Sequence, residues 1–439
     1  MFKNAATALQ IFETHRTMNL RAQDFTFLLI LSFCDAFSLY PSNSFPLQRR
    51  ECSQRLVSQL HVAGPIDIQE DRTTAEDLTT AEDLTDEPAA KDPLDRLRSI
   101  VDDIILIFNE MSESANDSDH ELCPDLVWEK TMKPLSLEMN ACESLLLANV
   151  AGDRKEEAKV KSVLREIVDP LRPFFKQSPC FYQSMEWPRG YAGDFEMVQL
   201  IMKQTNNVDK NKPVGYFLEE MILKQDICQQ HRNKMRYQGE VLIKECLERK
   251  SAVGETAEIL TLACGPCPDL QIIQDDIKDA NVHFTLLEKD IGAIHFSQSI
   301  LNPTLLEKCD FVDGNVLHLH RGNVVEYIPP KGYDLVLAGG LFDYLTDKMI
   351  TRLLAYVWND LQAPGGSIFF TNVAPEYKAD FHAEAIGNWS LIGRSDDELH
   401  KLCGQAGIPK DCVTTMYEST GITIMVTCRK PIDDTNVLQ

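Results

Sequence analysis

Residues 260–270 (LTLACGPCPDL) combine the residue types and spacing of a ligand-binding turn. An apolar run leads into Gly265, which can adopt backbone conformations closed to other residues, and Pro268 suits the first turn of a helix because its missing N–H would be unpaired there. A strand, a small-residue turn and a helix in this order direct free backbone N–H groups and the helix dipole at a ligand. The segment therefore predicts a nucleoside-binding turn.

A second candidate contact is Glu288, which ends the next apolar run and stands 23 positions after Gly265. An acidic side chain at an offset of roughly 20 residues accepts hydrogen bonds from ribose hydroxyls. The turn holds fewer glycines than a pyrophosphate site needs. We therefore expect a ligand without phosphates, held by its ribose and adenine.

The same turn also forms a dithiol motif, because Gly-Pro separates Cys264 from Cys267. A helix N-terminus lowers the pKa of a thiol as readily as it binds a nucleoside. However, no aromatic residue precedes Cys264, and the motif lies in an array of at least four strands whose later loops carry ligand-like residues. We favour the nucleoside interpretation, and redox modulation of that site stays open.

Those later loops follow two further predicted strands. In residues 311–315 (FVDGN), Asp313 can accept a hydrogen bond from an adenine amino group. Residues 333–345 (YDLVLAGGLFDYL) read as a buried strand that ends in two glycines, followed by Asp343 and Tyr344. In an open parallel sheet this strand end faces the ligand crevice.

The elements that would position these residues alternate between strand and helix from Glu258 onward. The alternation predicts an α/β fold with a mostly parallel sheet covered by helices on both faces. The apolar runs that we assign to strands are residues 259–263, 284–287, 333–338 and 367–371, with a final pair near 413–417 and 422–427.

Residues 93–250 form a helical domain in this prediction. Residues 94–108 and 158–168 repeat their apolar positions at the three-and-four spacing of an amphipathic helix, and residues 217–247 continue the pattern. The last segment carries a polar, basic stretch, which we interpret as a solvated helix face. Its members are Gln229, His231, Arg232, Lys234 and Arg236.

Residues 1–92 are expected to be a leader and an acidic, disordered linker. Residues 25–33 (FTFLLILSF) are far shorter than the roughly 18 apolar residues of a membrane span, but they suit a signal-peptide core. Residues 66–95 hold 11 acidic and 2 basic residues, and TTAEDL occurs twice from Thr73. We expect a cytoplasmic protein, or a plastid one if the leader is cleaved, since residues 35–37 (DAF) resemble the junction of algal plastid leaders.

The composition excludes several classes of protein. The chain has 439 residues, of which 44% are apolar and 25% charged, so it is neither collagen-like nor a disulfide scaffold. Its net charge of -24 argues against a nucleic-acid or membrane-surface partner. Thirteen scattered cysteines indicate mostly reduced thiols. We expect a small-molecule substrate, no nucleic acid, no stable membrane insertion and no metal.

The cysteine-containing turn, the acidic end of the second strand and the two later loops together resemble class I S-adenosylmethionine-dependent methyltransferases. More narrowly, residues 170–429 are similar to the bacterial enzymes that make 3-hydroxypalmitic acid methyl ester. Two features depart from that family: Cys267 stands where Gly or Ala is more usual, and a leader with an acidic linker is not expected. The similar segments are, in order, 188–196 (PRGYAGDFE), 340–345 (GLFDYL), 363–372 (APGGSIFFTN) and 389–399 (WSLIGRSDDEL).

The resemblance implies a Rossmann-like class I methyltransferase domain at residues 251–430, preceded by the helical domain as a substrate cap and followed by a tail at 431–439. It also implies S-adenosylmethionine as the cofactor. The implied cofactor contacts are Ala263, Cys264, Gly265, Glu288, Asp313, Asn315 and Gly339. The segment 189–194 would be a lid or substrate wall.

Methyl transfer from a sulfonium depends chiefly on the alignment of the nucleophile, the methyl carbon and the leaving sulfur, and it needs little further chemistry from the protein. A carboxylate acceptor needs no base, whereas a hydroxyl or amine needs one. The candidate catalytic residues are Asp343, Tyr191, Asp194 and His382. The candidate substrate contacts are Arg189 and Arg394, which could hold a carboxylate, and Tyr344 and Trp389, which would wall an apolar pocket.

The sequence therefore predicts an enzyme that methylates the carboxyl or hydroxyl of a fatty or hydroxy acid. One alternative is S-methylation of a small sulfur-containing acid, such as a methylthio-hydroxy acid. An alternative of another class is a catalytically inactive nucleoside-binding module used for regulation, to which the glycine-poor turn lends weight.

Overall fold

The computed structural model describes residues 92–114, 124–148, 150, 153–245, 250, 253–322, 324–375 and 382–432. These residues belong to one compact unit, which spans residues 85–439. The predicted leader, the linker as far as Lys91 and residues 433–439 lie outside the described residues. A search of the described helices for a membrane-crossing segment finds none of sufficient length and apolarity.

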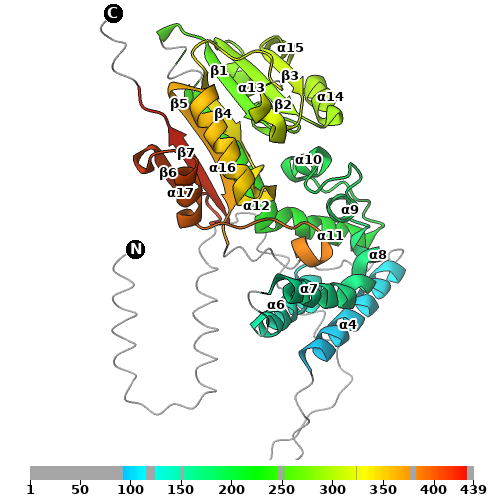
Figure 1. The fold of residues 1–439 in the computed structure, drawn as a ribbon. Helices are drawn as coiled ribbons and strands as arrows, with labels where there is room; N and C mark the ends of the chain where they lie inside the picture. Colours follow the sequence, from blue (N-terminus) through cyan, green and yellow to red (C-terminus); the bar gives the residue numbers. More distant parts are fainter. Residues whose placement is uncertain are drawn as a thin grey trace, which may run out of the picture. The chain divides into compact units, whose positions relative to one another are not determined.

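Helices fill the described chain between Pro93 and Ile243, as the sequence predicts (Figure 1). The first begins where the Asp92 side chain accepts a hydrogen bond from the Leu94 N–H, with Pro93 at the first helical position. The helices are α4 (Pro93–Glu113), α5 (Pro124–Lys130), α6 (Met132–Ala148), α7 (Arg154–Val168), α8 (Arg172–Phe175), α9 (Pro179–Glu186), α10 (Phe195–Lys203), α11 (Pro213–Lys224) and α12 (Asp226–Ile243), with a short 3-10 turn at Asp169–Leu171.

The predicted helical run 217–247 is two helices rather than one. Gln225 has an extended backbone with ψ at 150°, which ends α11 and starts α12. The interpretation of its basic stretch as a solvated face is wrong for three residues, because His231, Arg232 and Lys234 are 9%, 1% and 4% exposed. The Arg232 guanidinium donates to backbone carbonyls at Leu223 and elsewhere, so it joins neighbouring helices instead of facing solvent.

The sheet confirms the prediction of a Rossmann-like α/β fold. Its strand order is β3-β2-β1-β4-β5-β7-β6. The first five strands are parallel, in the 3-2-1-4-5 order of a doubly wound sheet, and β7 pairs antiparallel with both β5 and β6. The strands are β1 (Ala257–Leu262), β2 (Val282–Glu288), β3 (Cys309–Asp313), β4 (Tyr333–Ala338), β5 (Gln362–Val373), β6 (Val413–Tyr417) and β7 (Thr423–Arg429).

Helices cover both faces of this sheet, as predicted. Side chains alternate along a strand, so Leu260 packs in one core with Leu353 of α16 (Asp347–Tyr356), and its neighbour Ile259 packs in another with Ile273 of α13 (Pro268–Ile277). The helices of this part are α13 (Pro268–Ile277), α14 (Ile291–Ile300), α15 (Pro303–Leu306), α16 (Asp347–Tyr356) and α17 (Asp396–Gln405). Short 3-10 turns lie at Val316–Arg321, Phe342–Tyr344 and Lys410–Cys412, and π-helical turns at Val357–Leu361 and His382–Ile386.

The helices before β1 have a core of their own, which includes Phe108, Leu171 and Phe181. Ile386 and Trp389, from the segment after β5, join the same core. The chain therefore returns from the sheet to the helical segment, and this return brings residues that are distant in the sequence to one cavity.

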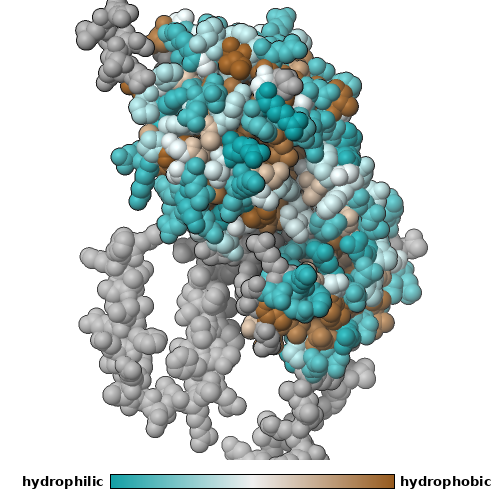
Figure 2. Space-filling model, viewed as in Figure 1, coloured by the Kyte–Doolittle hydropathy of each residue, from teal (hydrophilic) through white to brown (hydrophobic). Residues whose placement is uncertain are grey.

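On the face drawn in Figure 2, hydrophilic residues dominate over the sheet part of the chain.

Candidate functional site

A cavity of about 340 Å³ lies at the carboxyl ends of the parallel strands, where the helical segment covers them. The sheet side is formed by the residues that follow β1, β2, β3 and β4. The helical side comes from the loop before α10, from α10 itself and from one face of α12. In doubly wound sheets, ligands bind at this position.

The turn after β1 opens onto this cavity through an unusual backbone. Ala263, Gly265 and Cys267 all have positive φ, at 52°, 54° and 51°. Such angles are strained for residues other than glycine and recur at ligand sites. Apart from its chain neighbours Cys264 and Pro266, no heavy atom of the described residues lies within 4 Å of the position that a Cβ would take on Gly265, so the space beside this turn is open.

Glu288 ties the end of β2 to this turn. One carboxylate oxygen accepts from the Gly265 N–H at 2.8 Å, and the other accepts from the Lys289 and Asp290 N–H groups at 2.8 and 2.9 Å. The side chain is 5% exposed and lines the cavity. Because each carboxylate oxygen has two lone-pair directions, the group can still accept from a ligand hydroxyl.

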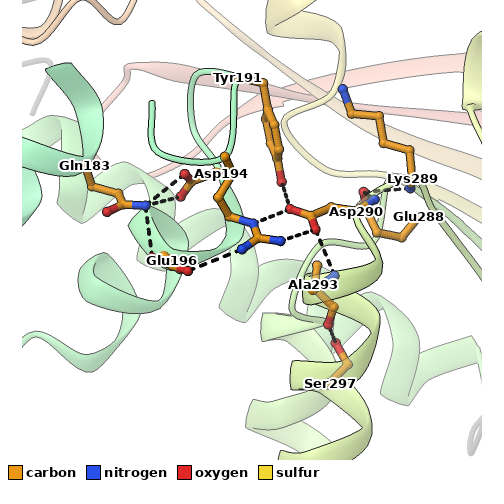
Figure 3. A network of polar contacts seen from close by, with 11 residues as sticks. Gln183, Tyr191, Asp194, Glu196, Glu288, Lys289, Asp290, Ala293 and Ser297 are labelled. Carbon is orange, nitrogen blue, oxygen red and sulfur yellow. Dashed lines mark hydrogen bonds and ion pairs between the residues drawn. The ribbon is translucent and has the colours of Figure 1, made fainter. Parts of the chain in front are cut away.

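A network at Asp290 fastens the loop before α10 to the start of α14 (Figure 3). Arg189 donates to both Asp290 carboxylate oxygens, and the Tyr191 hydroxyl donates to Oδ2 at 2.8 Å. Asp290 also accepts from the Gly292 N–H and thereby caps α14. Above all the Arg189 contact lowers the pKa of Asp290 to about 2, so this carboxylate is ionised at neutral pH.

Tyr344 and Trp389, which come from the loops after β4 and β5, form another wall of the cavity. The Trp389 indole N–H donates to the Tyr344 hydroxyl at 2.7 Å, and this hydroxyl lies against Gly193 of the loop before α10. Met197 and Ile201 of α10 add apolar surface to the same wall. This part of the cavity suits the apolar body of a ligand.

One face of α12 supplies polar groups in an otherwise apolar wall. Lys234 Nζ lies 4.0 Å from Asp343 Oδ2, and both side chains are 4% exposed. Burial lowers the pKa of Lys234 and raises that of Asp343, because each charged form loses hydration. Gln238 donates to Asp269 at 2.7 Å, and its carbonyl oxygen lies beside Gly339 without a hydrogen-bond partner among the described residues.

The two thiols of the turn are free and buried. A hydrogen bond with Cys267, together with burial, raises the pKa of Cys264 well above that of an exposed thiol. A reactive dithiol needs a thiolate. The site therefore does not favour thiol–disulfide exchange as the main activity.

The structure brings most of the residues predicted from the sequence to the cavity. They are Tyr191, Ala263, Cys264, Gly265, Glu288, Asn315, Gly339, Asp343, Tyr344 and Trp389. Sequence reasoning missed His231 and Lys234 as lining residues. Their spacing of three positions on one helix, together with Gln238 four positions later, is a signal that could have identified them.

Four predicted residues do not line this cavity. Asp313 is the exposed last residue of β3. Asp194 is buried and caps α10, accepting from the Met197 N–H and from the Gln183 amide. These contacts indicate a structural role for Asp194 instead of a catalytic one.

The two predicted substrate arginines are engaged by the protein itself. Arg189 is bound to Asp290, as described above. The Arg394 guanidinium donates to Asp347, to Asn372 and to two backbone carbonyls, and it is 3% exposed. Arg394 therefore braces the loops after β4 and β5 with four of its five N–H donors, and its burial keeps it from acting as an open carboxylate clamp. The side chain of His382 lies outside the described residues.

No protein-family model and no curated protein sequence matches this chain. Solved structures are similar to it at low identity. A "possible exported protein" from Bordetella parapertussis is 12% identical, with 79% of this chain and 100% of that chain covered and a TM-score of 0.43. A SAM-dependent methyltransferase of Leishmania major is 15% identical, with 56% and 89% covered and a TM-score of 0.32.

Magnesium protoporphyrin IX methyltransferase from Synechocystis, with S-adenosylhomocysteine bound, is 9% identical, with 47% of this chain and 87% of that chain covered and a TM-score of 0.35. All three TM-scores are below 0.5. The fold assignment therefore rests on the strand order, and any functional assignment rests on the site itself.

Proposed function

We propose that this chain is an S-adenosylmethionine-dependent methyltransferase that acts on the carboxyl or hydroxyl of a small fatty or hydroxy acid. The observation that carries the proposal is the Glu288 carboxylate, held by the Gly265 N–H at the edge of a cavity over the strand ends. The resemblance of the sequence to 3-hydroxypalmitic acid methyl ester enzymes supports a hydroxy acid as the acceptor, without fixing the length of its chain.

The residues present fit this cofactor. Beside Gly265 the turn leaves open space, as a nucleoside requires, and Oε2 of Glu288 retains one acceptor direction for a ribose hydroxyl. Asn315 follows β3, which pairs with β2, and Gly339 follows β4, which pairs with β1; both line the same cavity. When bound, S-adenosylmethionine supplies a methyl group on a sulfonium leaving group.

The protein's own part in the reaction is alignment and exclusion of water. The loop of residues 191–193, fastened through Asp290, closes the cavity beside Glu288. For a hydroxyl acceptor, Asp343 is the candidate base in the cavity, since burial raises the pKa of its carboxyl and so makes the carboxylate more basic. For a carboxylate acceptor no base is needed.

The size of the cavity favours a short acceptor over a long fatty chain. Ligand cavities range over roughly 300–1,000 Å³, and this one, at about 340 Å³, has to admit the nucleoside as well. The same observation favours a second candidate, S-methylation of a small sulfur-containing acid. Both candidates are acids of limited length.

Calorimetric titration with S-adenosylmethionine tests the first step of this proposal. We expect saturable binding; no binding at millimolar concentration would contradict a methyltransferase. Transfer of a labelled methyl group to a small-molecule extract, followed by mass spectrometry, then identifies the product. Binding without any transfer would support the regulatory module, and label on protein or nucleic acid alone would contradict the small-molecule assignment.

A further inference from the structure

We propose that Lys234 and His231 bind a carboxylate of the methyl acceptor, so that the acceptor is recognised as an anion. The inference rests on the proposed function, and it adds the group that selects the substrate. It concerns a polar face of α12 within the cavity.

The two residues lie on one helix face. Positions 231, 234 and 238 are separated by three and four residues, which places their side chains in a row along α12. All three line the cavity, with exposed fractions of 9%, 4% and 3%. A buried polar row is costly unless a ligand or the protein satisfies it.

The polar atoms of Lys234 and His231 in this row have no hydrogen-bond partner in the described part of the chain. The Lys234 ammonium has three donors, and in the described part of the chain its one recorded polar contact is Asp343 at 4.0 Å, which is beyond hydrogen-bond length. His231 Nε2 is buried with no hydrogen-bond partner among the described residues. Because buried polar groups are normally hydrogen-bonded, two ligand oxygens would complete both residues.

The surroundings of Lys234 also favour an acid. Asp343 already balances the charge of Lys234, so an added carboxylate needs a further positive charge, which the sulfonium of S-adenosylmethionine would supply under the proposed function. The apolar side chains of Met197, Ile201 and Met235 line the same cavity. They offer a surface for the acceptor body and lower the local dielectric, which strengthens an ion pair at Lys234.

The test uses the full-length protein loaded with sinefungin, an S-adenosylmethionine analogue that carries an amine at the position of the transferred methyl. The probes are 3-hydroxyoctanoate and 2-hydroxy-4-(methylthio)butanoate, each compared with its own neutral amide by calorimetry. We expect at least one acid to bind about tenfold more tightly than its amide. Lys234→Met should abolish this preference, and Lys234→Arg should keep part of it. Lys348→Met, at an exposed position of α16, should keep all of it.

The outcomes separate this inference from the proposed function. If sinefungin fails to bind the wild-type protein, the proposed function itself fails. If sinefungin binds but neither acid binds at millimolar concentration, or acid and amide bind equally, the carboxylate site is wrong. A Lys234→Met variant that binds sinefungin weakly but still prefers the acid would assign the lysine to the cofactor and overturn the proposal. The wild-type comparison of acid and amide decides the question even if the variant does not fold.

Discussion

The Arg189 guanidinium donates to both carboxylate oxygens of Asp290, and these two residues are 101 positions apart in the chain. Asp290 caps α14 and follows Glu288 by two residues. One ion pair therefore connects the loop over the cavity with the strand end that we expect to hold a ribose. Damage to this pair should loosen the loop and the cofactor site together.

The pH dependence of stability should report this ion pair. The folded-state pKa of Asp290 is about 2, below its ordinary value of 3.8. A depressed folded-state pKa means that the contribution is present above about pH 4 and is lost as the pH falls toward 2. We expect Asp290→Asn to lower the free energy of unfolding by about 1–2 kcal/mol at pH 7, and urea unfolding should show this deficit shrinking in acid.

Asp276→Asn is a matched control, because Asp276 is an exposed residue of α13. It should leave the unfolding free energy close to that of the wild type at every pH. A deficit of Asp290→Asn that stays constant between pH 7 and pH 3 would show that the carboxylate charge does not matter.

Replacement of Glu288 by Gln should weaken S-adenosylmethionine binding. The amide keeps the side-chain size but replaces one acceptor oxygen by a donor, so bonds to the ribose and to the Gly265 N–H are lost. We expect a loss of about 1–3 kcal/mol in calorimetric titration. Asp313→Asn, on the adjacent strand in register with Glu288 but outside the cavity, should bind normally. Equal losses in the two variants would place Asp313 back in the cofactor site.

Two glycines of one loop should respond differently to alanine. Gly190 and Gly193 both have positive φ, at 83° and 64°, so alanine costs about 1 kcal/mol of backbone strain at either position. At Gly193 the new Cβ would also collide with the Tyr344 hydroxyl, which Trp389 holds in place, whereas at Gly190 no atom of the described residues beyond the two chain neighbours lies within 4 Å.

We therefore expect Gly193→Ala to lower the melting temperature and the rate of methyl transfer more than Gly190→Ala does. Differential scanning calorimetry and an S-adenosylhomocysteine release assay measure the two effects. Similar values for both variants would mean that Tyr344 moves freely and does not form a fixed wall.

The parts of the fold that the sequence predicts are those with a local pattern. Residues 333–338 form a strand with the predicted bounds, because six consecutive buried residues between turn signals leave little else to form. Residues 413–417, from the predicted final pair of strands, are likewise β6. Helices before β1 are predicted by their apolar spacing, but the break at Gln225 is not, because its extended backbone leaves no mark in that spacing.

The site is predicted where it depends on strand ends and missed where it depends on long-range contacts. Glu288 and the glycine turn follow from their positions in the chain. From its residue type alone Arg394 could equally bind a substrate carboxylate, and only its contacts with Asn372, Asp347 and two backbone carbonyls show that most of its donors are already used. Lys234 reads as a surface lysine until α12 is seen to turn that face inward.

The helical wall of the cavity comes from two segments, residues 191–201 and 230–238, and the rest of the lining comes from later residues. Recombination or point changes in these two segments can therefore alter which acceptor is recognised while the strand-end groups stay the same. Under the proposed function, this separation would let related enzymes diversify in substrate without re-evolving the cofactor site. It also makes exchange of residues 191–238 between relatives a practical route to new acceptors.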